Sequence, residues 1–134
     1  NFSLKYAASD GTEKMPVVFH RAIFGSLERF LGVIIEHYAG VFPLWLAPLQ
    51  IQLLPIADRH ADYAETVAKT LREKGIRVEI NNKTGTLQGK IRDAALQKVP
   101  YLGIIGDKEI EENAVSLRVR GGEDQLKLNL TELI

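Results

Sequence analysis

The fold is decided by the part of the chain that begins with Leu49-Gln50-Ile51-Gln52-Leu53-Leu54-Pro55. This apolar run between turn signals is typical of a strand, and a helical pattern capped by Asp58 and closed by Gly75 follows it. The pattern then continues with a strand over 76–80, a helix over 87–98 and a strand over 101–105. Alternating strands and helices predict a mostly parallel sheet with helices packed against it.

Two further strands extend this sheet. Residues 114–120 and 125–130 are strand-like, and Gly121-Gly122 between them is a turn signal, so we expect a hairpin added to the parallel strands. The fold class is therefore α/β, with a mostly parallel mixed sheet flanked by helices.

A shorter pattern precedes this domain. Residues 2–7 and 16–24 are predicted strands, and Ser26 and Gly40 bound a predicted helix with one apolar stripe. Two strands and one helix cannot enclose a core, because about 40 residues is near the lower limit for an unaided fold. We expect this fragment of an antiparallel sheet to be exposed unless it packs on a neighbour or on a second copy.

Composition narrows the class of protein. The 134 residues are 46% hydrophobic and 25% charged, contain no cysteine, and include no apolar run long enough to span a membrane, so a soluble globular protein is expected. The N-terminus lacks a secretory pattern, and the absence of cysteine fits a cytoplasmic location. With 17 basic and 17 acidic residues the chain is uncharged overall, so recognition of a nucleic acid would depend on local base contacts.

One string combines a strand, a turn and a helix start: His20-Arg21-Ala22-Ile23-Phe24-Gly25-Ser26-Leu27-Glu28-Arg29-Phe30. Arg29 stands near the positive end of the predicted helix, where a cation is unfavourable. It therefore either faces an anionic partner such as a phosphate or is solvated beside Glu28. His20 lies in an apolar strand, where a lone histidine is usually a core residue with a hydrogen-bonded ring.

This string resembles the third signature motif of class II aminoacyl-tRNA synthetases, in the version found in threonyl-tRNA synthetases. Residues 42–50 resemble the join between the catalytic and anticodon-binding domains of that family, and Trp45 within it is interpreted as a buried anchor. Further strings follow in the order and spacing of the family: Gly75-Ile76-Arg77-Val78, Lys90-Ile91-Arg92, Val99-Pro100-Tyr101 and Gly106-Asp107-Lys108-Glu109. The resemblance covers nearly the whole chain.

The resemblance implies roles for the first two candidates. Arg29 matches the family's catalytic arginine, which contacts ATP by stacking on adenine and reaching the phosphates. His20 matches one of three zinc ligands, but the other two would precede Asn1, and His37 and His60 match no ligand position. One imidazole cannot complete a three-ligand site, so we predict that this chain does not hold zinc tightly. The family's second motif would also precede Asn1, so we predict no activity for the chain alone.

The resemblance also implies an anticodon site formed by Arg92, Glu109 and Arg118. Arginine donates in pairs to guanine and a carboxylate accepts from base amino groups, which suits reading of a single-stranded loop. Each residue also has a simpler interpretation, as a solvated helix, turn or strand residue. Thr84 stands where a family member has asparagine, so the paired amide contact of that position would be lost.

These expectations define a domain plan and a parent enzyme. Residues 1–42 are expected to be the end of a class II catalytic domain, 43–48 a linker, and 49–134 an anticodon-binding domain whose last helix, capped by Thr131, is cut short. The parent would use ATP with Mg²⁺ and one zinc ion to join threonine to its tRNA, without a membrane, as a homodimer. The alternatives are a prolyl-, glycyl- or histidyl-tRNA synthetase domain, or a non-catalytic protein that reuses the fold.

Overall fold

The computed structural model describes residues 3–122, 125–129 and 132. Contacts between residues divide the chain into two compact units, residues 1–34 and 35–134, which we describe separately. The last residue of the predicted final strand, Leu130, and the predicted helix cap, Thr131, lie outside the described residues.

The larger unit contains a five-stranded sheet in the order β4-β3-β5-β6-β7. β3 is parallel to both of its neighbours, and β6 is antiparallel to both of its neighbours. The strands are β3 (Ile51–Pro55), β4 (Val78–Ile80), β5 (Tyr101–Ile105), β6 (Ala114–Val119) and β7 (Gln125–Asn129). The mixed α/β sheet predicted from the sequence is confirmed.

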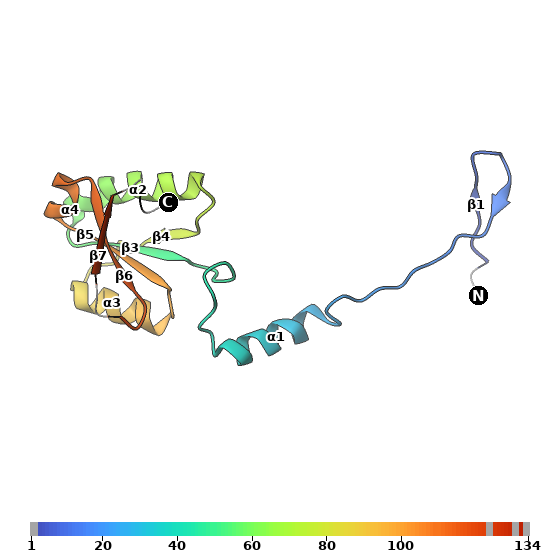
Figure 1. Ribbon diagram of the computed structural model, residues 1–134, viewed down its shortest axis with the longest axis horizontal. Helices are drawn as coiled ribbons and strands as arrows, with labels where there is room; N and C mark the ends of the chain where they lie inside the picture. Colours follow the sequence, from blue (N-terminus) through green and yellow to red (C-terminus); the bar gives the residue numbers. More distant parts are fainter. Residues whose placement is uncertain (1–2, 123–124, 130–131, 133–134) are drawn as a thin grey trace. The chain divides into compact units, whose positions relative to one another are not determined.

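Helices cover both faces of this sheet, with α2 on one face and α3 on the other (Figure 1). The bounds are Ala61–Glu73 for α2, Leu87–Leu96 for α3 and Asp107–Glu111 for the short helix α4. The predicted cap at Asp58 is wrong, because Asp58 opens a 3-10 turn (Asp58–His60) that precedes α2. Thr86 caps α3 instead by accepting a hydrogen bond from the Gly89 N–H at 3.2 Å.

The core has two layers because side chains alternate along β3. Ile51 and Leu53 pack with the α2 side of the sheet, whereas Leu54 packs with the α3 side. The α2 layer also contains Ala64, Val67, Ala68, Leu71, Ile105 and Val115, and the α3 layer contains Ala94, Val99 and Leu102. The register then fixes which residues of β6 share a face with α3, and the candidate site lies on that face.

The smaller unit is a hairpin followed by irregular backbone. β1 (Tyr6–Ala7) pairs antiparallel with β2 (Glu13–Lys14), and the Thr12 N–H donates to Asp10 Oδ1 at 3.1 Å in the turn. The predicted strand over 16–24 is wrong, since these residues have no regular secondary structure. An alternating pattern specifies two faces, but a strand also needs a hydrogen-bonded neighbour, which this segment lacks among the described residues.

Helix α1 (Leu27–Tyr38) crosses the boundary between the units and forms as predicted. Ser26 caps it, because the Arg29 N–H donates to Ser26 Oγ at 3.4 Å. Its apolar stripe is not covered, since none of the residues of α1 is buried. An apolar stripe is buried only where another element covers it, and Leu27 and Leu31 remain 62% and 47% exposed.

The connector between Pro43 and Pro48 is fastened by its backbone to the rest of the larger unit. Arg77 Nε donates to the Ala47 carbonyl at 2.9 Å, and Arg77 Nη2 donates to the Trp45 carbonyl at 2.9 Å. The interpretation of Trp45 as a buried anchor is wrong, since its side chain is 73% exposed. The carbonyl of Trp45, rather than the indole ring, makes the attachment.

Candidate nucleic-acid interface

Arg118 lies on the face of the sheet that α3 partly covers. It is directly opposite Leu102 in the pairing of β6 with β5, and Leu102 belongs to the core layer beneath α3. The side chain is half-buried, and its Nε donates to the Gly122 carbonyl at 3.1 Å. Within the described part of the chain, this bond leaves the two Nη nitrogens to form the paired contact that guanidinium groups make with base edges.

Glu109 is held against the same face by two hydrogen bonds. Ser116 Oγ donates to Glu109 Oε1 at 2.8 Å, and the Gly106 N–H donates to Glu109 Oε2 at 2.9 Å. Ser116 lies two residues before Arg118 on β6, so the two side chains share one face. The structure therefore brings together Glu109 and Arg118, which come from different elements.

The electrostatic environment keeps Glu109 ionised. Burial raises the pKa of Glu109, but the hydrogen bonds from Ser116 and from the Gly106 N–H outweigh it, so the pKa lies below its ordinary value. Lys127 adds to this effect, and its position opposite Ser116 on β7 places it on the same face. An ionised carboxylate can accept further hydrogen bonds from base amino or imino groups.

Arg92 lies on the flank of α3 that points away from β4. Lys90 marks the opposite flank, because its Nζ donates to the carbonyls of Pro55 and Asn81 at 2.9 and 3.3 Å. With about 100° per residue in a helix, Arg92 stands across the helix from Lys90, beyond the inward-facing Ile91. Arg92 is exposed on that flank, and α3 packs on the same face of the sheet that carries Arg118.

Thr84 is exposed in the loop between β4 and α3. β4 is the edge strand on the side of the sheet away from β6, and no described contact joins Thr84 to Glu109 or Arg118. The structure thus places three of the predicted anticodon residues around one face and the fourth on the loop beside it.

The two candidates of the smaller unit are not assembled into a site. His20 is exposed in irregular backbone, and Arg29 is exposed in the first turn of α1. In the described ranges, no group of at least three His, Cys, Asp or Glu side chains is placed to hold a metal ion. His20 alone does not fit a zinc site, which needs three or four protein ligands.

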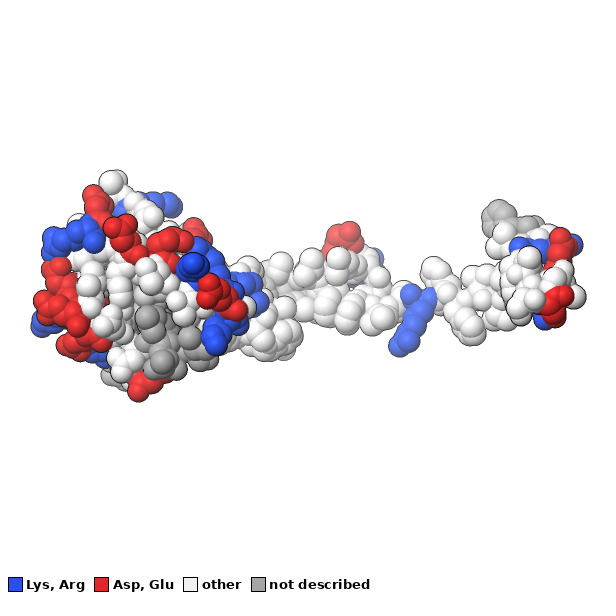
Figure 2. Space-filling model, turned by 90° about the horizontal axis from the view of Figure 1, so that it is seen from above, with Lys and Arg blue, Asp and Glu red and all other residues white. Residues whose placement is uncertain are grey.

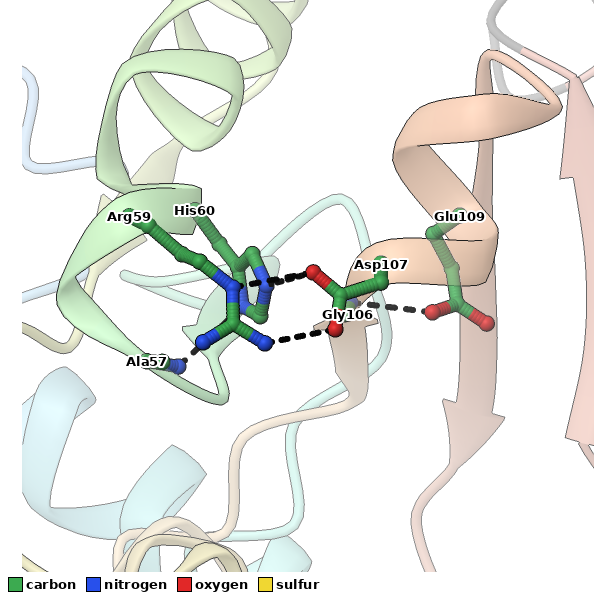
Figure 3. Close-up of polar contacts among 6 residues, drawn as sticks. All are labelled: Ala57, Arg59, His60, Gly106, Asp107 and Glu109. Carbon is green, nitrogen blue, oxygen red and sulfur yellow. Dashed lines mark hydrogen bonds and ion pairs between the residues drawn. The ribbon is translucent and has the colours of Figure 1, made fainter.

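A polar network that the sequence analysis missed positions α4, the helix that carries Glu109 (Figure 3). Asp107 accepts two hydrogen bonds from Arg59, from Nε at 3.0 Å and from Nη2 at 2.6 Å. Asp107 Oδ1 also lies 2.9 Å from Nε2 of the buried His60, whose Nδ1 accepts from the Ala57 N–H at 3.1 Å. The hydrogen bond from Ala57 fixes the proton on Nε2, so His60 donates to Asp107.

This network links the turn after β3 to the start of α4. The hydrogen bonds from Arg59 and then from His60 hold the pKa of Asp107 well below its usual range, and the same contact raises the pKa of Arg59. The signal in the sequence was the Gly106-Asp107-Lys108-Glu109 string, which placed two acids on a turn but did not reveal His60 as the partner of Asp107.

Charge on the larger unit is mixed rather than concentrated. In the view of Figure 2, basic and acidic side chains are interspersed over the described residues of 35–134, and neither sign covers the face. This distribution agrees with the equal numbers of basic and acidic residues in the sequence. A surface of this kind binds through a few placed groups rather than through a strong general field.

Comparison with known proteins identifies the fold family. A family model described as an anticodon binding domain matches residues 50–134, which includes the whole sheet and the helices α2, α3 and α4. The chain belongs to the anticodon-binding domain family. Among the described residues of this anticodon-binding domain, no helix has the length and apolar character needed to cross a membrane.

The chain is similar to threonine–tRNA ligases and to a threonyl-tRNA synthetase domain of known structure. The chain is 55% identical over 133 residues to a threonine–tRNA ligase of Acidobacterium capsulatum, a match that covers 99% of this chain and 20% of the relative. A solved structure of the RNA binding domain of threonyl-tRNA synthetase from Cryptosporidium parvum has a TM-score of 0.78 at 36% identity and covers 98% of this chain and 34% of that one.

A more distant structure agrees in fold alone. Prolyl-tRNA synthetase from Cryptosporidium parvum matches with a TM-score of 0.68 at 24% identity, over 78% of this chain and 24% of that one. The chain spans about a fifth of the length of the curated threonine–tRNA ligases that it matches.

Proposed function

We propose that this chain is part of a threonine–tRNA ligase and that its larger unit reads the anticodon of the tRNA for threonine. The observation that carries the proposal is the placement of Glu109 and Arg118 on one face of the sheet, linked through Ser116. Arg118 would donate in pairs to a guanine, and Glu109 would accept from a base amino or imino group. Arg92 would complete the site from the flank of α3.

The proposal extends to the whole enzyme. In this proposal the enzyme activates threonine with ATP and Mg²⁺ and transfers the threonine to tRNA. It works in the cytoplasm as a homodimer. Arg29 would contact ATP and His20 would ligate zinc only in that enzyme, where the remaining ligands and the second motif are present. The proposed domain plan keeps 1–42 as catalytic, 43–48 as linker and 49–134 as anticodon-binding.

Relatives favour this assignment over the alternatives. Three threonine–tRNA ligases each match 99% of this chain, whereas prolyl-tRNA synthetase shares only the fold at 24% identity. At Thr84, a hydroxyl would replace the paired amide contact of asparagine, so we propose a weaker base contact there.

The test is binding of this chain to the threonine tRNA transcript at fixed salt, beside a transcript altered only in the middle and last anticodon bases. We expect weaker binding to the altered transcript, and we expect Arg118→Ala to abolish the difference. Arg72→Ala is the matched control, because Arg72 pairs with Glu65 on α2, on the other side of the sheet. Equal binding of both transcripts by the unmodified chain would contradict anticodon reading and favour a protein that reuses the fold for other contacts.

A further inference from the structure

Helix α4 is too short to fix its own orientation. It has five residues, and an isolated helix shorter than about 12 residues is marginal in water, so tertiary contacts decide how it lies. Its first turn carries Glu109, to which the proposed function assigns the reading of a base. The contacts at this turn therefore determine where the carboxylate of Glu109 points.

The start of α4 is held by side chains from the turn that follows β3. Because β3 lies next to β5 and parallel to it, the turns after these two strands are neighbours. His60 Nε2 donates to Asp107 Oδ1 at 2.9 Å, and Arg59 donates to both carboxylate oxygens of Asp107 (Figure 3). Asp107 is the first residue of α4, so these hydrogen bonds hold the start of the backbone that carries Glu109.

The imidazole of His60 is the rigid member of this group. It is 2% exposed, and its Nδ1 accepts from the Ala57 N–H at 3.1 Å, so both ring nitrogens have a partner. The ion pair of Arg59 with Asp107 joins side chains that are 68% and 62% exposed, and water and salt weaken such a pair. His60 is therefore the partner of Asp107 whose own position is fixed by packing.

Gly106 provides the space that the carboxylate of Glu109 needs. A Cβ at Gly106 would lie 2.8 Å from Ile56 Cδ1 and 3.1 Å from Glu109 Oε2. The carboxylate thus packs against the backbone next to Asp107, where the Gly106 N–H donates to it at 2.9 Å. Because Asp107 follows Gly106 in the chain, a movement of Asp107 displaces this N–H and, with it, one of the hydrogen bonds that orient Glu109.

We propose that His60 and Asp107 are positioning residues of the anticodon site: their hydrogen bond sets the orientation of Glu109 and therefore the discrimination of the base that this carboxylate contacts. The inference rests on the proposed function, because it gives the two residues a role in the same site. They act through Glu109 rather than by touching the RNA. A carboxylate distinguishes a base amino group from a carbonyl oxygen only at hydrogen-bond distance and angle, so a loosened α4 reduces specificity more than affinity.

The first experiment measures discrimination, the ratio of the affinities for the threonine tRNA transcript and for the transcript altered in the middle and last anticodon bases. Asp107→Ala removes the acceptor at an exposed position, so the fold is kept. We expect discrimination to fall by roughly five- to tenfold. Arg77→Lys is the matched control, because it loses hydrogen bonds to the connector beside the edge strand β4 and should leave discrimination unchanged.

A pair of variants at His60 separates the hydrogen bond from the packing of the ring. His60→Leu fills the space without a donor, whereas His60→Gln keeps a side-chain N–H directed at Asp107. We expect His60→Leu to lose discrimination as Asp107→Ala does, and His60→Gln to recover most of it. Equal discrimination by the two His60 variants would mean that the ring acts through packing alone, which would overturn the inference. If His60→Leu does not fold, Asp107→Ala decides the question.

Hydrogen exchange of backbone amides gives a readout that needs no tRNA. The Gly106 amide donates to Glu109, so its exchange rate reports on that bond, while the amides of β3 and β5 report on overall stability. We expect the Gly106 amide to exchange faster in Asp107→Ala, without a matching change in β3 and β5. Unchanged exchange at Gly106 would mean that α4 is held without Asp107, and it would overturn the inference.

The outcomes of the tRNA experiment separate the inference from the proposed function. Unchanged discrimination in Asp107→Ala, with discrimination by the unmodified chain, would overturn the inference and leave anticodon reading standing. Faster exchange at Gly106 with unchanged discrimination would likewise overturn it, because the network would then serve stability alone. Absence of discrimination by the unmodified chain would reject the proposed function, and the inference with it.

Discussion

The hydroxyl of Ser116 on β6 donates a hydrogen bond to Oε1 of Glu109 on α4 at 2.8 Å. This contact joins the short helix α4 to β6, the strand that carries Arg118. It therefore holds the carboxylate of Glu109 against the same face of the sheet as Arg118. Because Ser116 is 9% exposed, water does not readily replace the bond.

Ser116→Ala should therefore lower the free energy of unfolding by about 1 kcal/mol at pH 7. It should also raise the pKa of Glu109 toward its ordinary value of 4.5, because one of the hydrogen bonds that lower it is lost. A carboxyl whose folded pKa is lowered stabilises the protein above its unfolded pKa, and this stability is lost as the pH falls through the folded pKa. Urea denaturation across this range, with an NMR titration of Glu109, measures both effects.

The difference in stability between the parent protein and Ser116→Ala should thus shrink below about pH 4. If it stayed constant down to about pH 2, the hydroxyl would be acting through packing rather than through the ionised carboxylate.

Gly103 in β5 is a position where close packing excludes a side chain. A Cβ added there would lie 2.6 Å from Leu53 Cδ2 and 3.0 Å from Val115 Cγ1, both in the core layer beneath α2. Gly103→Ala should therefore destabilise the fold by about 1–3 kcal/mol, measured by urea denaturation. Gly122→Ala is the control, since its nearest neighbour would be the Val119 carbonyl at 3.5 Å, and we expect little change. Equal stability of the two variants would show that the core relaxes around the new methyl group.

The sheet could be predicted from the sequence because its strands are short apolar runs between turn residues. The bounds of β5, Tyr101–Ile105, are those predicted, since Pro100 and Gly106 delimit it. Helix α4 was not predicted, because its five residues are too few to show helical periodicity. The prediction of a strand over 16–24 was wrong for the opposite reason. The alternating pattern was present, but among the described residues the segment has no neighbouring strand to pair with.

The candidate site could be predicted only in part. Alternation along β6 places Ser116 beside Arg118, so that relationship follows from sequence alone. The contact of His60 with Asp107 joins residues 47 positions apart and depends on β3 lying next to β5, which periodicity does not reveal.

Asp107 should make stability depend on pH at the acidic end of the range. Its pKa is lowered in the folded state, by the hydrogen bonds from Arg59 and then from His60, below the ordinary value of 3.8. The stabilisation is therefore complete above the unfolded pKa and is lost as the pH falls through the folded pKa. Asp107→Asn should lower the midpoint of thermal unfolding near neutral pH, and this difference should diminish below about pH 4.

Asp62→Asn is the matched control for this experiment, because Asp62 is an exposed acid in the first turn of α2 that forms no ion pair within the described residues. We expect its effect on stability to be small. An effect of Asp107→Asn that persisted at low pH would indicate that the amide disturbs the start of α4 by another route.

Arg77 should control the mobility of the connector, and Trp45 reports on it. The guanidinium donates to the carbonyls of Ala47 and Trp45 at 2.9 Å, and Trp45 is the only tryptophan of the chain. Arg77→Lys keeps the charge but loses the forked geometry that reaches both carbonyls. We expect lower steady-state fluorescence anisotropy of Trp45 and a loss of about 1 kcal/mol in the free energy of unfolding.

Arg72→Lys is the matched control, since the guanidinium of Arg72 bonds only to the exposed Glu65 among the described residues and the change should leave the fluorescence of Trp45 unchanged. The indole is 73% exposed, so its anisotropy depends on how firmly its own backbone is held rather than on packing of the ring. Unchanged anisotropy in Arg77→Lys would mean that the hydrogen bond from Gln50 Nε2 to the Leu44 carbonyl, at 3.0 Å, is sufficient to hold the connector. The double variant with Gln50→Ala would then lower the anisotropy, because it would disrupt the hydrogen bonds that the side chains of both Arg77 and Gln50 donate to the connector.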